Sequence, residues 1–152
     1  MKKLLTIKKS YFLLSLVAIL FTSCEIHIED SVDPYENEVV GTWTFDQVLL
    51  DYGSNTVNIT ADYYDFVLDL HNDNYAKLRD RHTGQVYTGS WEVFFDGGHG
   101  GQSDYHFELY LNDSFSGESF TIRGVNFDIS GNFMYFDEDY DSDYYAYRLR
   151  RY

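Results

Sequence analysis

Cysteine and proline each occur only once in this chain of 152 residues, as Cys24 and Pro34. A single thiol excludes an intramolecular disulfide and any metal site built from several cysteines. Methionine is also scarce, with two residues, whereas 15 tyrosines and 12 phenylalanines help to bring the aromatic content to 19%. Aromatic side chains favour β-strands, because they fit a pleated and half-buried surface. Composition and length together predict a single domain rich in β-structure.

Basic side chains are also few, since 11 Lys and Arg stand against 25 Asp and Glu and the net charge is −14. Residues 1–23 hold four lysines and no acidic residue, so residues 24–152 carry a net charge of −18. So acidic a chain repels phosphate backbones and anionic lipid surfaces. Nucleic acid is therefore not an expected partner, and any contact with a membrane has to come from the N-terminal segment.

The N-terminal segment has the order of a secretory signal peptide. A basic stretch, MKKLLTIKKS, precedes the apolar run YFLLSLVAILF at residues 11–21, and the small residues Thr22 and Ser23 follow. The run is too short to span a bilayer, which takes about 20 residues. The alternative is a buried core helix, but flanking lysines at the extreme N-terminus are not core features. We therefore predict a signal peptide over residues 1–23.

This segment resembles the signal peptide of bacterial lipoproteins, which ends in a lipobox cysteine. Thr22 and Ser23 suit the two positions before Cys24, while Phe21 departs from the usual leucine. The resemblance implies that Cys24 is acylated with palmitate-type chains, becomes the first mature residue, and anchors the protein to the outer membrane. Several acyl chains anchor firmly where one would be marginal. Residues 24–38 read as an acidic tether, and the implied location is the cell envelope, at the periplasmic face or the cell surface.

Residues 39–152 consist of short alternating runs separated by turn signals. Strands are expected over 39–50, 54–60, 64–70, 75–81, 85–95, 104–112, 119–129, 133–139 and 144–152. On the first of them, Trp43, Phe45, Gln47 and Leu49 are expected to share one face with Gly41. Short strands at this spacing predict an antiparallel barrel, with a β-sandwich as the alternative.

The triplets GTW at 41–43 and GSW at 89–91 make this region similar to the lipocalins. Small bacterial lipocalin-like lipoproteins carry a lipobox, a short tether, a GTW strand and a later G-[ST]-W strand in this order. The resemblance implies an eight- to nine-stranded barrel with structural motif residues Gly41, Trp43, Gly89 and Trp91. It also implies that Trp43 plugs one end and that a late arginine stacks on it, with Arg148, Arg150 and Arg151 as candidates. The helix that usually follows a lipocalin barrel is missing.

Catalytic and metal motifs are weak in this sequence. Asp139, Asp141 and Asp143 have the spacing of a Ca²⁺ loop, but the glycine and glutamate of an EF-hand are missing, so an acidic turn at 137–143 is the plainer interpretation. Histidines are scattered, and His99 with His106 forms at most a loose pair. Nucleophile elbows, P-loops and HExxH motifs are absent from the sequence. We therefore expect neither an enzyme, nor a cofactor, nor a metal site.

Tyrosine is more abundant than a small core needs. Several tyrosines are expected at a barrel mouth or on the surface, namely Tyr63, Tyr64, Tyr87, Tyr110, Tyr144 and Tyr145. Tyrosine packs against apolar ligands and sugar rings while its hydroxyl stays in water. We therefore expect a lipid-anchored binding protein for a small hydrophobic or glycan ligand. The alternatives are an envelope interaction or structural lipoprotein with a filled barrel, and a β-sandwich glycan-binding module.

Overall fold

The computed structural model describes residues 35–96, 105–140 and 142–152. The chain forms two units, residues 1–31 and 32–152, and all described residues belong to the second. The predicted signal peptide, Cys24, most of the predicted tether, His99 and Asp141 lie outside the described residues.

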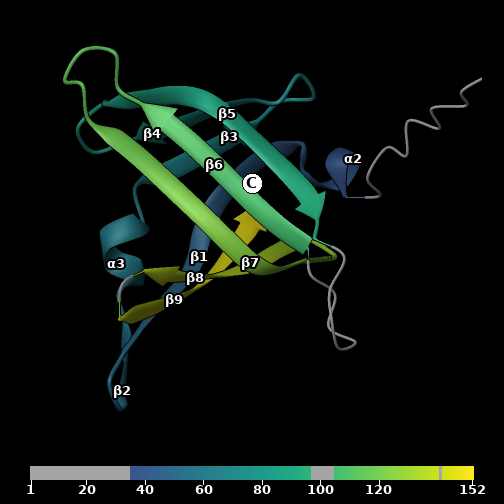
Figure 1. The fold of residues 1–152 in the computed structure, drawn as a ribbon. Helices are drawn as coiled ribbons and strands as arrows, with labels where there is room; N and C mark the ends of the chain where they lie inside the picture. Colours follow the sequence, from purple (N-terminus) through teal and green to yellow (C-terminus); the bar gives the residue numbers. More distant parts are fainter. Residues whose placement is uncertain (1–34, 97–104, 141) are drawn as a thin grey trace, which may run out of the picture. The chain divides into compact units, whose positions relative to one another are not determined.

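Nine strands and two single-turn helices make up the described part of the chain (Figure 1). The strands are β1 (Gly41–Tyr52), β2 (Asn55–Asn58), β3 (Phe66–Leu70), β4 (Tyr75–Asp80), β5 (Val86–Phe95), β6 (Tyr105–Asn112), β7 (Ser119–Ser130), β8 (Phe133–Tyr140) and β9 (Asp143–Arg151). The helices are α2 (Glu36–Val39) and α3 (Thr60–Tyr63). All nine expected strands are present. Each helix has only four residues, which is too short to leave a helical period in the sequence.

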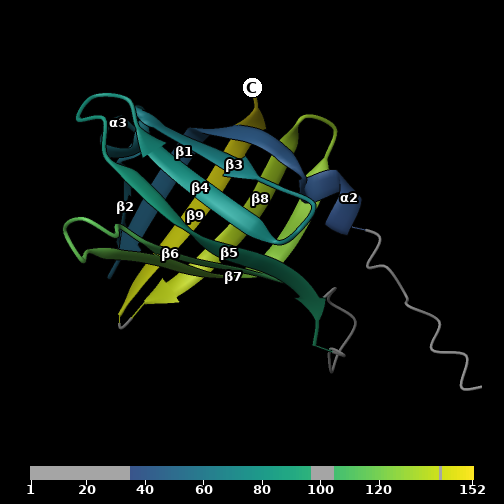
Figure 2. The ribbon, with the colours of Figure 1, turned by 90° about the horizontal axis from the view of Figure 1, so that it is seen from above.

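The strands close into an eight-stranded antiparallel barrel with one extra strand (Figure 2). Neighbours follow one another from β3 to β9, and β1 completes the ring by pairing with β3 on one side and β9 on the other. β2 is outside the ring and pairs only with the end of β1. Closure removes the open sheet edges of a sandwich. The prediction of an antiparallel barrel is therefore confirmed.

A β-bulge in β1 changes which residues face inward. The register between β1 and β9 shifts between Phe45 and Gln47. The extra residue moves the following side chains to the opposite face, so Val48 is fully buried. Gln47 and Leu49 line an outer groove instead. The expectation that these two residues share the face of Trp43 was wrong, because alternation in the sequence does not reveal a bulge.

Large side chains fill the centre of the barrel. The largest fully buried ones are Trp43, Phe107, Phe127, Phe136, Leu68, Leu78, Leu109, Leu111, Ile122, Met134, Leu149 and Val39. Val39 comes from α2, and the others come from every strand of the ring except β5, which adds Trp91 and Val93. An eight-stranded barrel is just wide enough to be filled by its own side chains or to hold one small ligand.

Packed structure begins before the expected domain boundary at residue 39. Tyr35 makes edge-to-face contacts with Tyr105 and Phe127, with ring centroids 4.7 and 5.5 Å apart. α2 then places Val39 in the core with no exposed surface. The described end of the predicted tether thus belongs to the barrel. Within residues 35–152, apart from the gaps, no helix is long and apolar enough to cross a membrane.

Candidate functional site

One end of the barrel is closed by Trp43 and Arg151. The Trp43 indole N–H donates to the carbonyl oxygen of Val39 at 2.7 Å. The guanidinium carbon of Arg151 lies 4.5 Å from the centroid of the Trp43 ring. Arg151 also donates to the carbonyl oxygens of Glu38 and Val40. Of the three candidate arginines, Arg151 is therefore the one that stacks on the tryptophan, and it ties α2 to the end of β9.

Gly41 makes room for this arginine. A methyl group on Gly41 would lie 2.7 Å from Arg151 Nη1, and the φ angle of Gly41 is +150°, which side chains disfavour. The glycine of the GTW triplet is thus matched to the arginine that stacks on the tryptophan. These residues hold the closed end together.

The second triplet has a similar construction. The Trp91 indole N–H donates to the carbonyl oxygen of His71 at 2.9 Å, and Trp91 is 2% exposed. A methyl group on Gly89 would lie 1.9 Å from the carbonyl oxygen of Tyr110. Gly89 therefore permits a close approach of β5 and β6 that no other residue would allow. In each triplet the glycine leaves space that a side chain would fill, and the buried tryptophan donates its indole N–H to a backbone carbonyl oxygen.

At the opposite, open end the inward-facing side chains stay half-buried. These are the aromatic residues Tyr63, Phe66, Tyr87, Phe120 and Tyr145, which pack on the rim of the core. Tyr63 projects from α3 and contacts Phe45 and Tyr147, with ring centroids 5.2 and 6.0 Å apart. The open end is therefore lined by aromatic rings that keep part of their surface in solvent.

Glu138 lies at the open end, at the place where β7 and β8 separate. The two strands pair from Ser130 back to Val125, and Figure 1 shows them diverging toward the open end. Glu138 bridges the divergence by accepting the backbone N–H of Arg123 and the hydroxyl of Tyr147, each at 3.1 Å. Burial raises the pKa of the Tyr147 hydroxyl, and the nearby Tyr63 and Glu138 raise it further.

Two turns at the open end share the pattern Asp-x-x-Ser/Thr-Gly, at residues 80–84 and 113–117. In the first, Asp80 accepts the backbone N–H groups of His82 and Thr83 at 2.7 and 3.2 Å and the Thr83 hydroxyl at 2.6 Å. The Thr83 hydroxyl bond is the largest cause of the lowered pKa of Asp80. The closing glycine has a φ of +78°, in the left-handed region that glycine tolerates.

The second turn repeats these bonds. Asp113 accepts the backbone N–H of Phe115 at 2.8 Å and the hydroxyl of Ser116 at 2.7 Å, and these bonds lower its pKa. Gln85 joins the two turns by donating to Asp113 and Glu118 at 3.1 and 2.8 Å. The residues of both turns line an open groove of about 590 Å³. These turns fix the rim of the open end on the side of β5 and β6.

A separate cleft lies on the outside of the barrel, where β1 leaves β3. β1 pairs with β3 only through Gly41–Thr44 and with β2 only from Leu49 onward, and α3 occupies the space between. The cleft has a volume of about 310 Å³ and is lined by Thr44, Phe45, Asp46, Thr60, Tyr64, Arg81, Arg150 and Tyr152.

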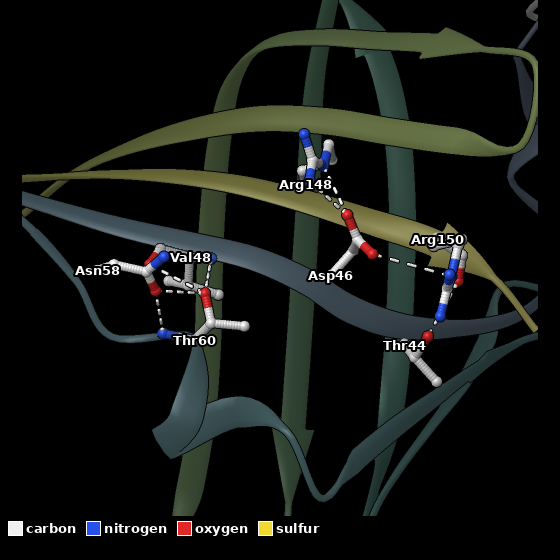
Figure 3. Close-up of polar contacts among 7 residues, drawn as sticks. All are labelled: Thr44, Asp46, Val48, Asn58, Thr60, Arg148 and Arg150. Carbon is white, nitrogen blue, oxygen red and sulfur yellow. Dashed lines mark hydrogen bonds and ion pairs between the residues drawn. The ribbon is translucent and has the colours of Figure 1, made fainter.

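Thr60 attaches α3 to the edge of β1 (Figure 3). Its hydroxyl accepts the backbone N–H of Val48 at 2.9 Å and donates to Asn58 at 2.7 Å. The Ile59 backbone N–H donates to the carbonyl oxygen of Val48 at 3.0 Å. β3 pairs with β1 only near the start of β1. At Val48 these hydrogen bonds from Thr60 and Ile59 take the place of strand pairing, and they fix one wall of the cleft.

Asp46, at the bulge of β1, is paired with two arginines on β9. Figure 3 shows its carboxylate directed at both of them. Arg148 Nε lies 2.8 Å from Asp46 Oδ2, and Arg150 Nε lies 3.8 Å from Oδ1. On the far wall, Arg81 donates to the carbonyl oxygen of Tyr64 at 2.9 Å, and its guanidinium lies over the Tyr64 ring. The lining of the cleft therefore includes two arginines and one acidic side chain, in a strongly acidic protein.

The two metal patterns considered from the sequence are not tested, because Asp141 and His99 lie outside the described residues. In the described part of the chain, no three His, Cys, Asp or Glu side chains are grouped as metal ligands. His106 stacks on Phe94, with ring centroids 5.2 Å apart, and lies 3.8 Å from Asp96. Of the acidic turn, Asp139 and Asp143 belong to β8 and β9.

The arginine-lined cleft was not predicted from the sequence. Its residues come together only because β3 leaves β1 and α3 occupies the space between them.

Comparisons with known proteins found no matching family model, no matching curated protein and no matching solved structure. The fold itself, a closed eight-stranded antiparallel barrel, is compatible with a lipocalin-like binding domain.

Proposed function

We propose that the chain is a lipid-anchored envelope lipoprotein that binds a small hydrophobic or glycan ligand at the open end of its barrel. The observation that carries this proposal is the set of half-buried aromatic side chains at the open end, Tyr63, Phe66, Tyr87, Phe120 and Tyr145. At the closed end Trp43 is fully buried and Arg151 lies over its ring. Aromatic walls with a few polar groups are typical of small-molecule sites.

The polar groups at this end define how a ligand is held. The Tyr147 ring packs against the rings of Tyr63 and Tyr145, and its hydroxyl donates to Glu138. A ligand with an apolar or sugar-ring face stacks on the tyrosines, and its hydroxyl or amine groups donate to Glu138. Burial disfavours ionisation of Tyr147, so its neutral hydroxyl donates to Glu138 and holds that carboxylate in place.

The test of ligand binding is mass spectrometry of small molecules extracted from the full-length protein purified in detergent. We expect a bound compound in the wild type and its loss in Tyr87→Ala and Tyr145→Ala, which remove half-buried rings at the open end. Tyr135→Ala removes an exposed tyrosine and is the matched control. An empty wild-type protein, or equal loss in the control, would refute the proposal.

The anchor is tested separately at Cys24. Replacing Cys24 by Ala or Ser removes the acylated thiol, and we expect the variant to leave the membrane fraction and to fail to incorporate a labelled fatty acid. A variant that stays in the membrane fraction would refute lipidation. This result does not depend on whether the barrel holds a ligand.

A second function, an interaction or structural lipoprotein with no small ligand, is favoured by the filled centre of the barrel. In that case the acidic surface contacts an envelope partner. The two functions differ in the extraction experiment, because only the first predicts a bound compound that open-end variants lose.

A further inference from the structure

We propose that the cleft between β1 and α3 is a second binding site, and that its ligand is a sugar carrying a carboxylate, such as a hexuronic acid. The cleft lies on the outer side of β1, and Tyr87, Phe120 and Tyr145 of the open end are not among its lining residues. Its volume of about 310 Å³ is at the lower limit of small-molecule sites, which suits a single sugar ring.

The charge of the cleft identifies the ligand as an anion. Residues 24–152 contain only seven Lys and Arg, yet Arg81 and Arg150 line this one cleft and Arg148 adjoins it. Asp46 is the acidic side chain of the lining, and Arg148 binds it more closely than Arg150 does. Arg150 therefore keeps most of its guanidinium free, and its side chain is 60% exposed. Arginine binds carboxylates through paired N–H donors.

The walls identify the rest of the ligand as a polyhydroxylated ring. Tyr64 and Tyr152 are 68% and 82% exposed, so their rings offer apolar faces on which the C–H face of a sugar can stack. Thr44 and Thr60 add hydroxyl groups to the lining. Apolar faces and hydroxyls beside two guanidinium groups fit a carboxylated sugar better than a bare inorganic anion.

The site is already held in shape without a ligand. The Arg81 guanidinium is fixed by its bonds to the carbonyl oxygens of Tyr64 and Asp65 and by its position over the Tyr64 ring. Thr60 holds α3 against β1 through Val48. A rigid site loses little conformational entropy on binding, which favours affinity.

The test is calorimetric titration of the full-length protein in detergent with glucuronate, glucose and inorganic phosphate. We expect glucuronate to bind, glucose to give no measurable binding, and phosphate to bind more weakly than glucuronate. Arg150→Gln, at an exposed side chain, is expected to weaken glucuronate binding about tenfold or more, because the charge-assisted hydrogen bonds of its guanidinium are lost. Added salt is expected to weaken the interaction.

The control is Arg79→Gln, which removes an arginine that pairs with Asp69 outside the cleft. An affinity unchanged in Arg150→Gln, equal binding of glucose, or tighter binding of phosphate would overturn the proposal. Tyr87→Ala separates this site from the open end of the barrel. If Tyr87→Ala abolishes glucuronate binding and Arg150→Gln does not, the sugar binds at the open end and the cleft proposal fails, while the proposed function stands.

Discussion

The stacking of Arg151 on Trp43, at 4.5 Å from guanidinium carbon to ring centroid, joins the last strand to the first at the closed end of the barrel. The same guanidinium donates to the carbonyl oxygens of Glu38 and Val40. One side chain therefore stabilises both the closure between β1 and β9 and the position of α2.

Arg151→Ala is expected to lower the free energy of unfolding by about 2 kcal/mol or more. The substitution removes a cation–π contact of about 0.5–2 kcal/mol and two hydrogen bonds of about 1 kcal/mol each. Urea denaturation followed by tryptophan fluorescence measures the change. Arg150→Ala, at a 60% exposed side chain, is expected to cost less than about 1 kcal/mol. Equal losses in the two variants would show that Arg151 has no special role.

Glycine-to-alanine variants are expected to differ sharply by position. Gly89→Ala places a methyl group 1.9 Å from the backbone of Tyr110 and forces β5 and β6 apart, whereas Gly41→Ala meets the end of a flexible arginine at 2.7 Å. Gly53→Ala meets nothing within 4 Å but keeps a φ of +63°, which costs about 1 kcal/mol. The expected order of destabilisation is Gly89, Gly41, then Gly53. Thermal unfolding of the three variants checks it, and a Gly89→Ala variant as stable as Gly53→Ala would contradict the close approach.

The fold was predictable because strand alternation and turn residues are local signals. Each expected strand is present, and the stretch from Tyr105 to Leu111 faces inward and outward as its alternation predicts. The bulge at Phe45 and Gln47 was not predictable, since the extra residue is defined only by the partner strand β9. Likewise, the sequence offered three arginines as partners for Trp43. Only the pairing of β1 with β9, which places Arg151 opposite Trp43, shows which of them it is.

The candidate sites depended still more on long-range contacts. Half-buried tyrosines at a barrel mouth were expected, and Tyr63, Tyr87 and Tyr145 are at the open end. The cleft was missed because Arg81 and Arg150 are 69 positions apart in the sequence. A signal for the paired turns did exist, since Asp-x-x-Ser/Thr-Gly occurs at residues 80–84 and 113–117.

The two turn aspartates predict a loss of stability in acid. Hydrogen bonds lower the pKa of Asp80 and Asp113 below the ordinary value of 3.8. A lowered pKa in the folded state stabilises the protein above the unfolded pKa, and this contribution disappears as the pH falls through the folded pKa, below about pH 4. In Asp113→Asn we therefore expect lower stability at neutral pH and a smaller further loss between about pH 5 and pH 3.

Urea denaturation at a series of pH values measures this dependence. Asp62→Asn, which removes one exposed carboxylate from α3, is the control for the change in net charge. If Asp62→Asn flattens the acid dependence as much as Asp113→Asn does, the effect comes from overall charge and not from the turn.

At high pH the buried hydroxyl of Tyr147 predicts a second loss of stability. Burial raises its pKa well above the ordinary 10.0, so the folded state keeps the proton while the unfolded state releases it. The contribution of Tyr147 is therefore complete below about pH 10 and is lost as the pH rises further. Burial and a hydrogen bond to Asp137 also raise the pKa of Tyr144, to about 12.

Tyr147→Phe is expected to flatten the fall in stability above about pH 10, because phenylalanine has no proton to release. At neutral pH the variant loses the bond to Glu138, which contributes about 1 kcal/mol. Denaturation between about pH 8 and pH 11 measures both effects. The control is Tyr140→Phe, at a 64% exposed tyrosine. If stability falls as steeply above about pH 10 in Tyr147→Phe as in Tyr140→Phe, then Tyr147 has the same pKa in the folded and the unfolded state. In that case water reaches the Tyr147 hydroxyl and Glu138 at the open end of the barrel, contrary to the packing described above.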